Sequence, residues 1–275
     1  MTADVAVDPS LVRSSYLSLE GGSTLALLTL DRAEQMNPLD HPSVLALRDA
    51  IESALARDDV RAIALTGAGR AFSAGGDMKK YLQLQGDRHA FTRFLLDLHG
   101  VFDSLATCRV PTIALVNGIA IAGGMELVLA CDVAFAAQSA RIGDAHLPFG
   151  QMGGGGVLSR LPRRVGSHRA RELIFSGRIL PADEAAAWGL VNRVVPDADL
   201  IAAAVDLGND IARKSPLAVA NVKRVLAQID FHGLGLDDAL AFEREVTIDY
   251  CLDSQDAREG LEAFSAKRRP EFRGV

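Results

Sequence analysis

Two short glycine-containing segments carry the residues of this sequence best suited to chemistry. The first is GRAFSAGGDMKK at residues 69–80, and the second is NGIAIAGGMEL at residues 117–127. In the second segment, Gly123 and Gly124 open an apolar stretch predicted to be helical, so the Gly123 amide is a free donor at the positive end of a helix dipole. Such an amide suits a carbonyl oxygen that becomes an oxyanion.

A carboxylate follows the glycine pair within the same segment. Glu126 lies three residues after Gly123, about one helical turn, in an otherwise apolar stretch. This position fits a general acid or base beside an oxyanion site. It fits equally well an acidic residue that the helix dipole favours in a first turn, without any catalytic role. The residues alone leave both interpretations open.

A third segment, IGDAHLPFGQMGGGG at residues 142–156, combines His146 with four consecutive glycines. A P-loop needs a Gly-Lys pair, which the sequence lacks, and GAGRAF at residues 67–72 lacks the third glycine of a dinucleotide fingerprint. We therefore interpret the glycine run as a close-packing turn and not as a phosphate loop. His146 is either an acid–base group or a residue that only shapes the site.

Metal and nucleophile sites are not indicated. The six histidines show no HExxH or other paired ligand spacing, and no GxSxG elbow is present. The three cysteines are scattered without CxxC spacing, so neither a zinc site nor a disulfide framework is predicted. We expect chemistry that uses no metal.

Composition limits the class of partner. The 275 residues are 49% hydrophobic and 23% charged, with a net charge of -6. This mildly acidic balance argues against a general binder of nucleic acid or of anionic membranes. No uninterrupted apolar run reaches the roughly 18 residues of a membrane span, and residues 1–15 lack the basic start and apolar run of a signal peptide. We predict a cytoplasmic protein.

Alternating short strands and helices must position these segments. Residues 16–20 and 24–30 predict a strand pair joined by a two-residue Gly21-Gly22 hairpin. Apolar spacing from Val44 predicts a helix to about Arg57, with capping candidates at its start, namely Asp40, His41 and Ser43. Later segments alternate in the same way, with strands predicted at 61–67, 111–118 and 132–137 and helices at 91–102 and 123–131. Because the last third is mostly helix-like, we predict an α/β domain followed by a helical layer.

The two glycine-containing segments together resemble the enoyl-CoA hydratase/isomerase family, also called the crotonase family. AFSAGGDMK and NGIAIAGGMEL match its AFxAGxDxK and NGxAxGGGxEL patterns, and the resemblance continues through LDRAEQMNPL, FGQMGGGGVLSRLPRRVG, FSGRILPADEAAAWGLVNRVV and AFSAKRRPEF. It implies a crotonase-like spiral of repeated strand-strand-helix units followed by a C-terminal helical layer. It further implies an α/β core with the acyl-CoA site over residues 1–200 and a helical oligomerisation region over 201–275.

The resemblance also implies a binding site for an acyl-CoA thioester. The family's two oxyanion amides fall on Ala74 and Gly123, which would polarise the thioester carbonyl. The substrate would lie along the residues that surround these amides, namely Ala74, Gly75, Gly76, Asp77, Met78 and Gly124. Lys79 or Lys80 could approach the CoA phosphates. Asp77 as a simple helix cap and the lysines as a solvated face remain open alternatives.

The first catalytic glutamate of the hydratases falls on Glu126, whereas the position of the second holds His146. An imidazole keeps a titratable group with donor and acceptor atoms at that place. We expect Glu126 and His146 to form an ion pair that lowers the pKa of the carboxylate and raises that of the histidine. Strand-like alternation places Asp144 on the same face as His146, as a minor candidate.

The function that the resemblance implies is the reversible hydration of a 2-enoyl-CoA to a 3-hydroxyacyl-CoA. No cofactor is expected beyond the coenzyme A of the substrate, and no nucleic acid or membrane partner. Alternatives are another enolate reaction of the family, namely isomerisation, C–C hydrolysis or decarboxylation, and a catalytically silent acyl-CoA-binding homologue. A homotrimer or hexamer is expected, with Phe264 and Lys267 near the CoA, of the same or a neighbouring subunit.

Overall fold

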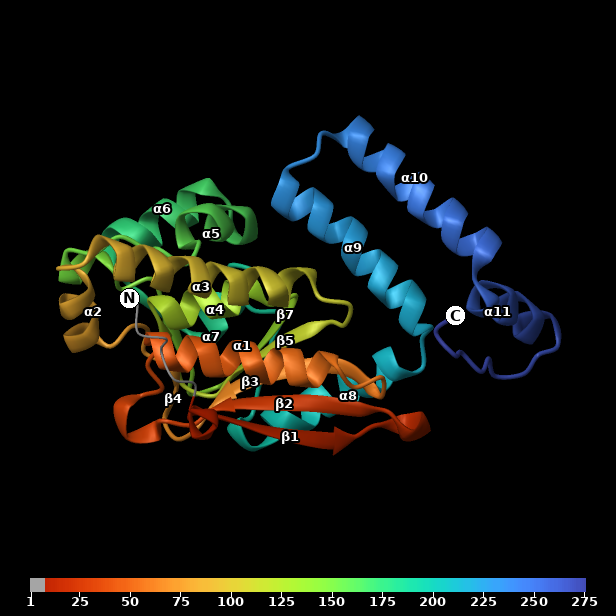
Figure 1. Ribbon diagram of the computed structural model, residues 1–275, viewed down its shortest axis with the longest axis horizontal. Helices are drawn as coiled ribbons and strands as arrows, with labels where there is room; N and C mark the ends of the chain where they lie inside the picture. The colour runs from red at the N-terminus through yellow and green to blue at the C-terminus, as the bar shows by residue number, and fades with distance from the viewer. Residues whose placement is uncertain (1–7) are drawn as a thin grey trace.

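The computed structural model describes residues 8–275 and contains two β-sheets with helices around them (Figure 1). Residues 1–7, which carry part of the signal-peptide expectation, lie outside this range. The larger sheet has the strand order β1-β2-β3-β5-β7-β10 and the smaller sheet has the order β4-β6-β8-β9. Within the described chain, no helix has the length and apolar character needed to cross a membrane.

The larger sheet is parallel except for its first pair, and its central strands are buried. Its strands are β1 (Val12–Ser18), β2 (Thr24–Leu30), β3 (Val60–Gly67), β5 (Thr112–Val116), β7 (Val133–Ala137) and β10 (Arg193–Val195). Within this sheet β1 and β2 pair antiparallel, and all the other neighbouring strands pair parallel. Every residue of β5 is buried, which is typical of a parallel strand covered on both faces.

Each central strand of the larger sheet is followed by a short strand of the smaller sheet. The short strands are β4 (Ala71–Ser73), β6 (Ile119–Ile121), β8 (Arg141–Gly143) and β9 (Ile179–Pro181). The pairs β3-β4, β5-β6 and β7-β8 each lead into helices, so the chain repeats a strand-strand-helix unit. The predicted spiral of α/β units is confirmed by this order.

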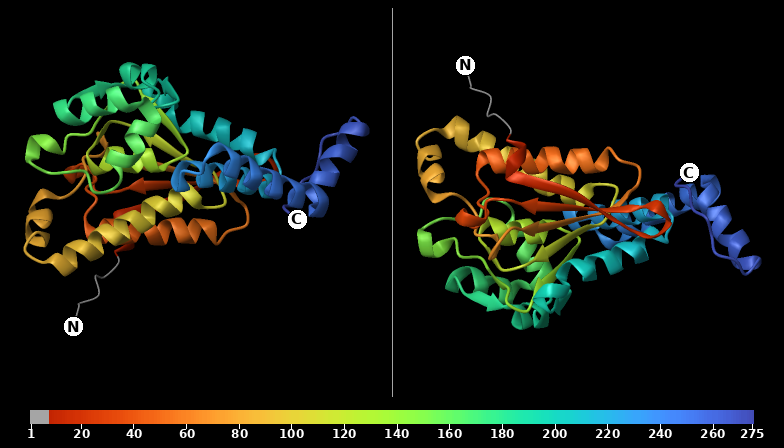
Figure 2. Two further views of the ribbon diagram at one scale, coloured as in Figure 1. Left: turned by 90° about the horizontal axis from the view of Figure 1, so that it is seen from above. Right: turned by 90° about the horizontal axis from the view of Figure 1, so that it is seen from below.

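The helices cover both faces of the larger sheet and fill the space between the two sheets. They are α1 (His41–Leu55), α2 (Met78–Leu84), α3 (Arg88–Thr107), α4 (Gly123–Ala130), α5 (Val157–Val165), α6 (Ser167–Ser176), α7 (Ala182–Ala187), α8 (Leu200–Ala212), α9 (Pro216–His232), α10 (Leu236–Asp253) and α11 (Gln255–Ser265). Helices α1 and α8 lie on opposite faces of the sheet (Figure 2). Helix α4 is buried along its whole length and contacts β4, β5 and β6.

Helices α9 to α11 extend away from the two sheets as an arm (Figure 1). The boundary expected between the α/β core and the C-terminal helical region, at residues 200 and 201, falls at the first residue of α8. That helix packs on β2, β3, β5 and β7, so the chain leaves the sheets only after Ala212. The arm is tied to the core by Lys223 of α9, whose ammonium lies 2.6 Å from Asp132 Oδ2.

Two local predictions differ from the structure. The β1–β2 hairpin closes over residues 19–23, because Ser18 pairs with Thr24, and a 3₁₀ turn at Glu20–Gly22 forms the bend. Gly21 and Gly22 both have positive φ, as such a bend favours, but the predicted two-residue turn is wrong. Strands β9 and β10 lie inside the last third of the chain, which was predicted to be helical. Each has only three residues, which is too short to show the alternation of apolar residues that predicts a strand.

Candidate active site

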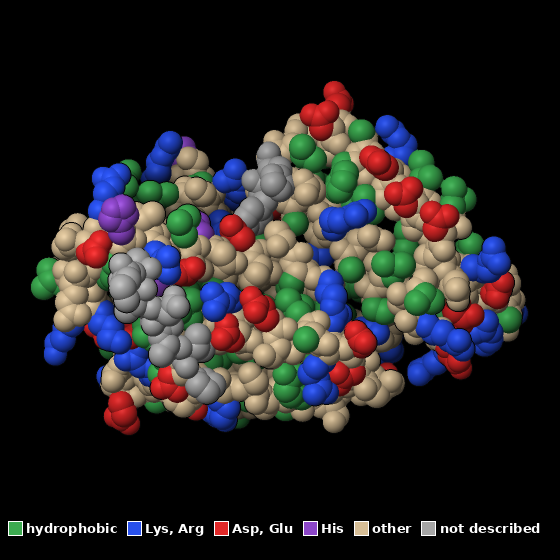
Figure 3. All heavy atoms as spheres, viewed as in Figure 1, with side chains coloured by type: hydrophobic (Ala, Val, Ile, Leu, Met, Phe, Trp, Pro, Cys, Tyr) green, Lys and Arg blue, Asp and Glu red, His purple; other side chains and the backbone are tan. Residues whose placement is uncertain are grey.

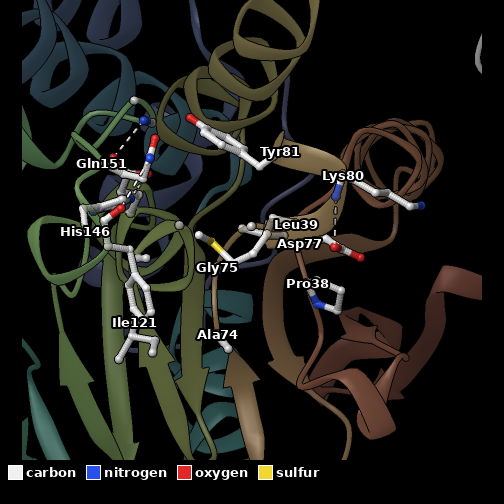
Figure 4. Close-up of a pocket in the computed structure, with 18 of the residues that line it drawn as sticks. Pro38, Leu39, Ala74, Gly75, Asp77, Lys80, Tyr81, Ile121, His146 and Gln151 are labelled. Atoms are coloured by element: carbon white, nitrogen blue, oxygen red, sulfur yellow. Dashed lines mark hydrogen bonds and ion pairs between the residues drawn. The ribbon is translucent and has the colours of Figure 1, made fainter. Parts of the chain in front are cut away.

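A cavity of about 740 Å³ opens beside the N-terminus of α4. Apolar side chains form much of its wall, among them Leu39, Phe94, Leu95, Leu98 and Ile121. Glu126 and His146 are the candidate acid–base pair in it, while Arg32, Lys79 and Lys80 add positive charge. Figure 4 shows His146 and Gln151 on one side of the cavity and Pro38, Leu39 and Lys80 on the other. A mostly apolar wall with a few convergent polar groups is typical of a ligand site.

The two glycine-containing segments meet at this cavity, as predicted. Gly75 has a φ of +87°, and a Cβ atom there would lie 2.8 Å from Ala122 Cβ and 2.9 Å from the Gly123 nitrogen. Only glycine allows so close an approach of the two backbones. Ala122 has φ 50° and ψ -123°, and this bend begins α4 at the next residue. As the first residue of the helix, Gly123 has an amide without an intrahelical acceptor.

The Ala74 amide, which was expected to bind the thioester oxygen, is not a free donor. It donates to the carbonyl oxygen of Met36 at 2.9 Å, so one of the two expected oxyanion amides already has an acceptor. Met36 lines the cavity and has a left-handed φ of 58°. A substrate oxygen can use the Ala74 amide only if it takes the place of the Met36 carbonyl.

Glu126 is buried, with 2% of its surface exposed, and its carboxylate has two backbone donors. Oε1 accepts from the amide of Gly155 at 2.8 Å and from that of Val157 at 3.1 Å. A Cβ atom on Gly155 would lie 2.7 Å from Oε2. The glycine run is therefore a close-packing turn, as predicted, and Gly156 at φ 112° is the residue before α5. These two donors were not identified from the sequence, although the glycine run was the signal that could have located them.

His146 stands between two carboxylates. Its Nδ1 lies 2.6 Å from Oδ1 of Asp144, and its Nε2 lies 3.9 Å from Oε2 of Glu126. The shorter contact is a hydrogen bond, in which Nδ1–H donates to the carboxylate. The longer one exceeds hydrogen-bond length but suits a single bridging water. This places Nε2 and Oε2 as a pair of acid–base atoms on the cavity.

Asp144 contacts His146 for a different reason from the one expected. Strand β8 ends at Gly143, Ala145 has a positive φ of 42° and His146 has a helical backbone. Strand-like alternation therefore does not apply here, and a tight turn brings the two side chains together. Asp144 is 1% exposed and is the hydrogen-bond partner that orients the imidazole.

Of the two pKa shifts predicted for Glu126 and His146, only the one for His146 agrees with the structure. Burial raises the pKa of the Glu126 carboxyl above its usual value, and this outweighs the opposing effects of His146 and of the two backbone amides. The expected lowering is therefore wrong, because desolvation of the charged form exceeds the attraction within the pair. For His146, burial lowers the pKa, but the Asp144 hydrogen bond and the Glu126 charge outweigh it, so the pKa of the imidazole is raised as expected.

The basic end of the cavity is partly organised by buried Asp40. Its Oδ2 lies 2.7 Å from Lys80 Nζ and 2.6 Å from an Arg32 nitrogen, so Lys80 is held in an ion pair. Asp77 caps α2, because its side chain accepts from the amides of Lys79 and Lys80 (Figure 4). Asp77 therefore both caps a helix and lines the cavity.

The remaining expected site residues divide between the cavity and other places. Gly76 and Met78 line it, whereas Gly124 and Lys267 are absent from its described lining. Gly124 packs against β4, where a Cβ atom would lie 2.1 Å from the Ser73 carbonyl oxygen. Lys267 follows α11, at the far end of the molecule from the α2 side of the cavity (Figure 1). Within a single chain, Lys267 therefore does not reach the site.

The comparisons with known proteins agree on one family. The sequence model described as "Enoyl-CoA hydratase/isomerase" matches residues 20–275. A putative enoyl-CoA hydratase of Thermus thermophilus is 34% identical over 251 residues, covering 90% of this chain and 97% of that protein. A short-chain-enoyl-CoA hydratase of Clostridium acetobutylicum is 34% identical over 260 residues, covering 92% and 95%. The crystal structure of an enoyl-CoA hydratase from Bacillus anthracis superposes with a TM-score of 0.88 at 31% identity, covering 96% of this chain and all of that one.

Proposed function

The chain belongs to the enoyl-CoA hydratase/isomerase family, and from this premise we propose that it catalyses the reversible hydration of a 2-enoyl-CoA to a 3-hydroxyacyl-CoA. The observation that carries the proposal is the facing pair of Glu126 Oε2 and His146 Nε2, 3.9 Å apart on the cavity that Gly123 also lines. Hydration needs one group that takes a proton from water and another that gives a proton to carbon. It involves no net oxidation, so the proposed reaction requires no redox cofactor.

The proposed first step is activation of the thioester. Its carbonyl oxygen accepts a hydrogen bond from the Gly123 amide, at the end of α4 where the helix dipole favours negative charge. The Ala74 amide supplies a second bond when the thioester oxygen replaces the Met36 carbonyl. Both donors stabilise the charge that develops on this oxygen as an enolate forms.

The proposed second step is the addition of water. A water between Glu126 and His146 gives a proton to Oε2 as its oxygen bonds to C3, and the electrons of the double bond move to the thioester oxygen. His146 gives its Nε2 proton to C2, which restores the carbonyl. The proton on Glu126 then returns to Nε2, so the net change is the addition of one water. Asp144 keeps Nε2 directed at the reaction by binding Nδ1.

The rest of the cavity fits the two ends of an acyl-CoA. The apolar wall formed by Phe94, Leu95 and Leu98 suits an acyl chain, and Lys79 and Lys80 suit the phosphates of CoA. The relatives that carry hydratase names support the same substrate class.

A spectrophotometric assay tests this proposal. The protein is incubated with crotonyl-CoA and longer 2-enoyl-CoAs, and the loss of enoyl thioester absorbance is followed for wild type, Glu126→Gln, His146→Ala and His146→Glu. We expect turnover by wild type and a fall in kcat of about 10²–10⁴-fold in Glu126→Gln, the usual contribution of a general base. CoA binding measured by calorimetry should persist in that variant.

Three other results of this assay would change the interpretation. Tight CoA binding without turnover of any enoyl-CoA by wild type would overturn the hydratase proposal in favour of a silent binding protein. Formation of an isomer without uptake of water would show a different enolate reaction. Full activity of His146→Glu would show that histidine and carboxylate are interchangeable at this position.

A further inference from the structure

The glycine run that binds Glu126 is itself held from its other side by helix α3. His99 of α3 has its Nε2 atom 2.6 Å from the carbonyl oxygen of Gly154. The amide nitrogen of the same peptide group is that of Gly155, which donates to Glu126 Oε1 at 2.8 Å. His99 and Glu126 are therefore joined through a single peptide unit.

The direction of this chain of hydrogen bonds is fixed by its middle member. A backbone carbonyl can only accept, so Nε2 of His99 carries the hydrogen. Hydrogen bonds in series polarise one another, and a donor at the carbonyl end of a peptide strengthens its N–H as a donor. A donor at the Gly154 carbonyl can thus strengthen the bond from the Gly155 amide to Glu126 without touching the carboxylate.

The next peptide of the run is held in a similar way. The Gly155 carbonyl oxygen accepts from Arg160 Nη1 at 2.9 Å, and Arg160 Nη2 lies 2.8 Å from Asp103 Oδ1. Asp103 lies four residues after His99 on α3, so both side chains project from one face of that helix. Two consecutive carbonyls of the run are therefore held by hydrogen bonds that lead back to a single helix face.

We propose that His99 is a positioning residue for Glu126. By holding and polarising the peptide between Gly154 and Gly155, it keeps Oε1 bound to the Gly155 amide and leaves Oε2 directed at His146. The effect on turnover rests on the proposed function, whereas the effect on the carboxylate does not.

Several groups act on Glu126 besides His99, and they stay unchanged in the test. They are Tyr81 of α2, Asp144 and His146 in the turn after β8, the Gly155 amide of the glycine run, and Arg160 and the Val157 amide of α5. A change in the titration of Glu126 when only His99 is replaced is therefore assigned to the peptide that His99 holds.

The test uses variants of His99 in the full chain. His99→Leu and His99→Phe remove the donor with different side-chain volumes, and His99→Gln keeps an N–H donor. His89→Leu is the matched control, because His89 is an exposed histidine of the same helix. The titration of the Glu126 carboxyl is followed by ¹³C NMR of glutamate-labelled protein and assigned with Glu126→Gln. Kinetics with crotonyl-CoA give kcat and KM for each variant.

We expect Glu126 to titrate at higher pH in His99→Leu and His99→Phe, because a weaker Gly155 donor stabilises the charged carboxylate less. We expect kcat to fall about tenfold with little change in KM, a size seen when outer-shell partners of metal ligands are removed. His99→Gln should restore both quantities, and His89→Leu should match wild type.

An unchanged Glu126 titration in either donor-free variant that retains the wild-type circular dichroism spectrum would overturn the inference. Failure of His99→Gln to restore a shifted titration would also overturn it. If wild type does not hydrate any enoyl-CoA, the proposed function fails, and the NMR titration still decides the role of His99.

Discussion

The two oxygens of Glu126 have different surroundings. Oε1 accepts two backbone amides, and Oε2 faces Nε2 of His146 across 3.9 Å. Burial raises the pKa of this carboxyl despite the nearby imidazole, so Glu126 is a stronger base than an exposed glutamate. His146 retains its proton to higher pH because Asp144 and Glu126 together outweigh the effect of burial. Both shifts suit a base that takes a proton and an acid that gives one.

The pH profile provides a prediction at the scale of single residues. Asp144→Asn removes a charge and a hydrogen bond that raise the pKa of His146. The imidazolium then loses its proton at lower pH, so the basic limb of the kcat/KM profile should move to lower pH, and kcat should fall by about tenfold. Hydration of crotonyl-CoA measured across pH checks this.

The control for that profile is Asp253→Asn, at an exposed position of α10, which should leave both limbs in place. A basic limb that does not move in Asp144→Asn would contradict a role for Asp144 in holding the proton of His146.

At the scale of elements, the site depends on how closely α4 approaches β4. A Cβ atom on Gly124 would lie 2.1 Å from the carbonyl oxygen of Ser73, whereas one on Gly100 of α3 would meet nothing within 4 Å. Gly124 is therefore important for packing, although the sequence suggested that it binds substrate.

A pair of alanine substitutions tests this packing. Gly124→Ala should lower the free energy of unfolding by about 1–3 kcal/mol, because the helix must move away from β4. Gly100→Ala should raise it by about 0.5–1 kcal/mol, since alanine favours a helix interior. Urea unfolding followed by circular dichroism measures both. Equal effects of the two substitutions would show that the close approach in the structure is not rigid.

At the scale of the whole molecule, the arm of α9 to α11 exposes apolar side chains. Leu252 is 77% exposed and Phe264 is 85% exposed, and hydrophobic side chains are visible along the arm in Figure 3. Large exposed apolar surfaces usually mark an interaction site. The trimer or hexamer that the family resemblance implies remains a prediction, and this surface is where copies of the chain would meet.

Sedimentation velocity checks that prediction. Wild type should sediment as a trimer or hexamer, and replacing both Leu252 and Phe264 by aspartate should give smaller species, because buried charge disfavours the contact. Leu96→Asp, at an exposed site of α3, serves as the comparison outside the arm. A monomeric wild type at micromolar concentration would contradict the predicted assembly.

Most of the fold could be predicted because its signals are local. Helix α1 begins at His41 and is capped by Asp40, one of the predicted caps, and the strands β3, β5 and β7 appear where short apolar runs indicated them. The three-residue strands β9 and β10 could not be predicted, because their pairing and not their sequence makes them strands. The same holds for the hairpin turn, whose register is set by pairing of β1 with β2.

The sequence by itself determined which residues could do chemistry, since residue type and spacing along the chain place Glu126, His146 and the Gly123 amide. Only the tertiary structure decided which groups contact them. The donors to Glu126 lie 29 and 31 residues away in the chain, and the acceptor of the Ala74 amide belongs to the separate loop at Met36. The pKa of Glu126 rises because packing removes water from the carboxyl, and desolvation depends on every neighbour at once. No local pattern carries that information.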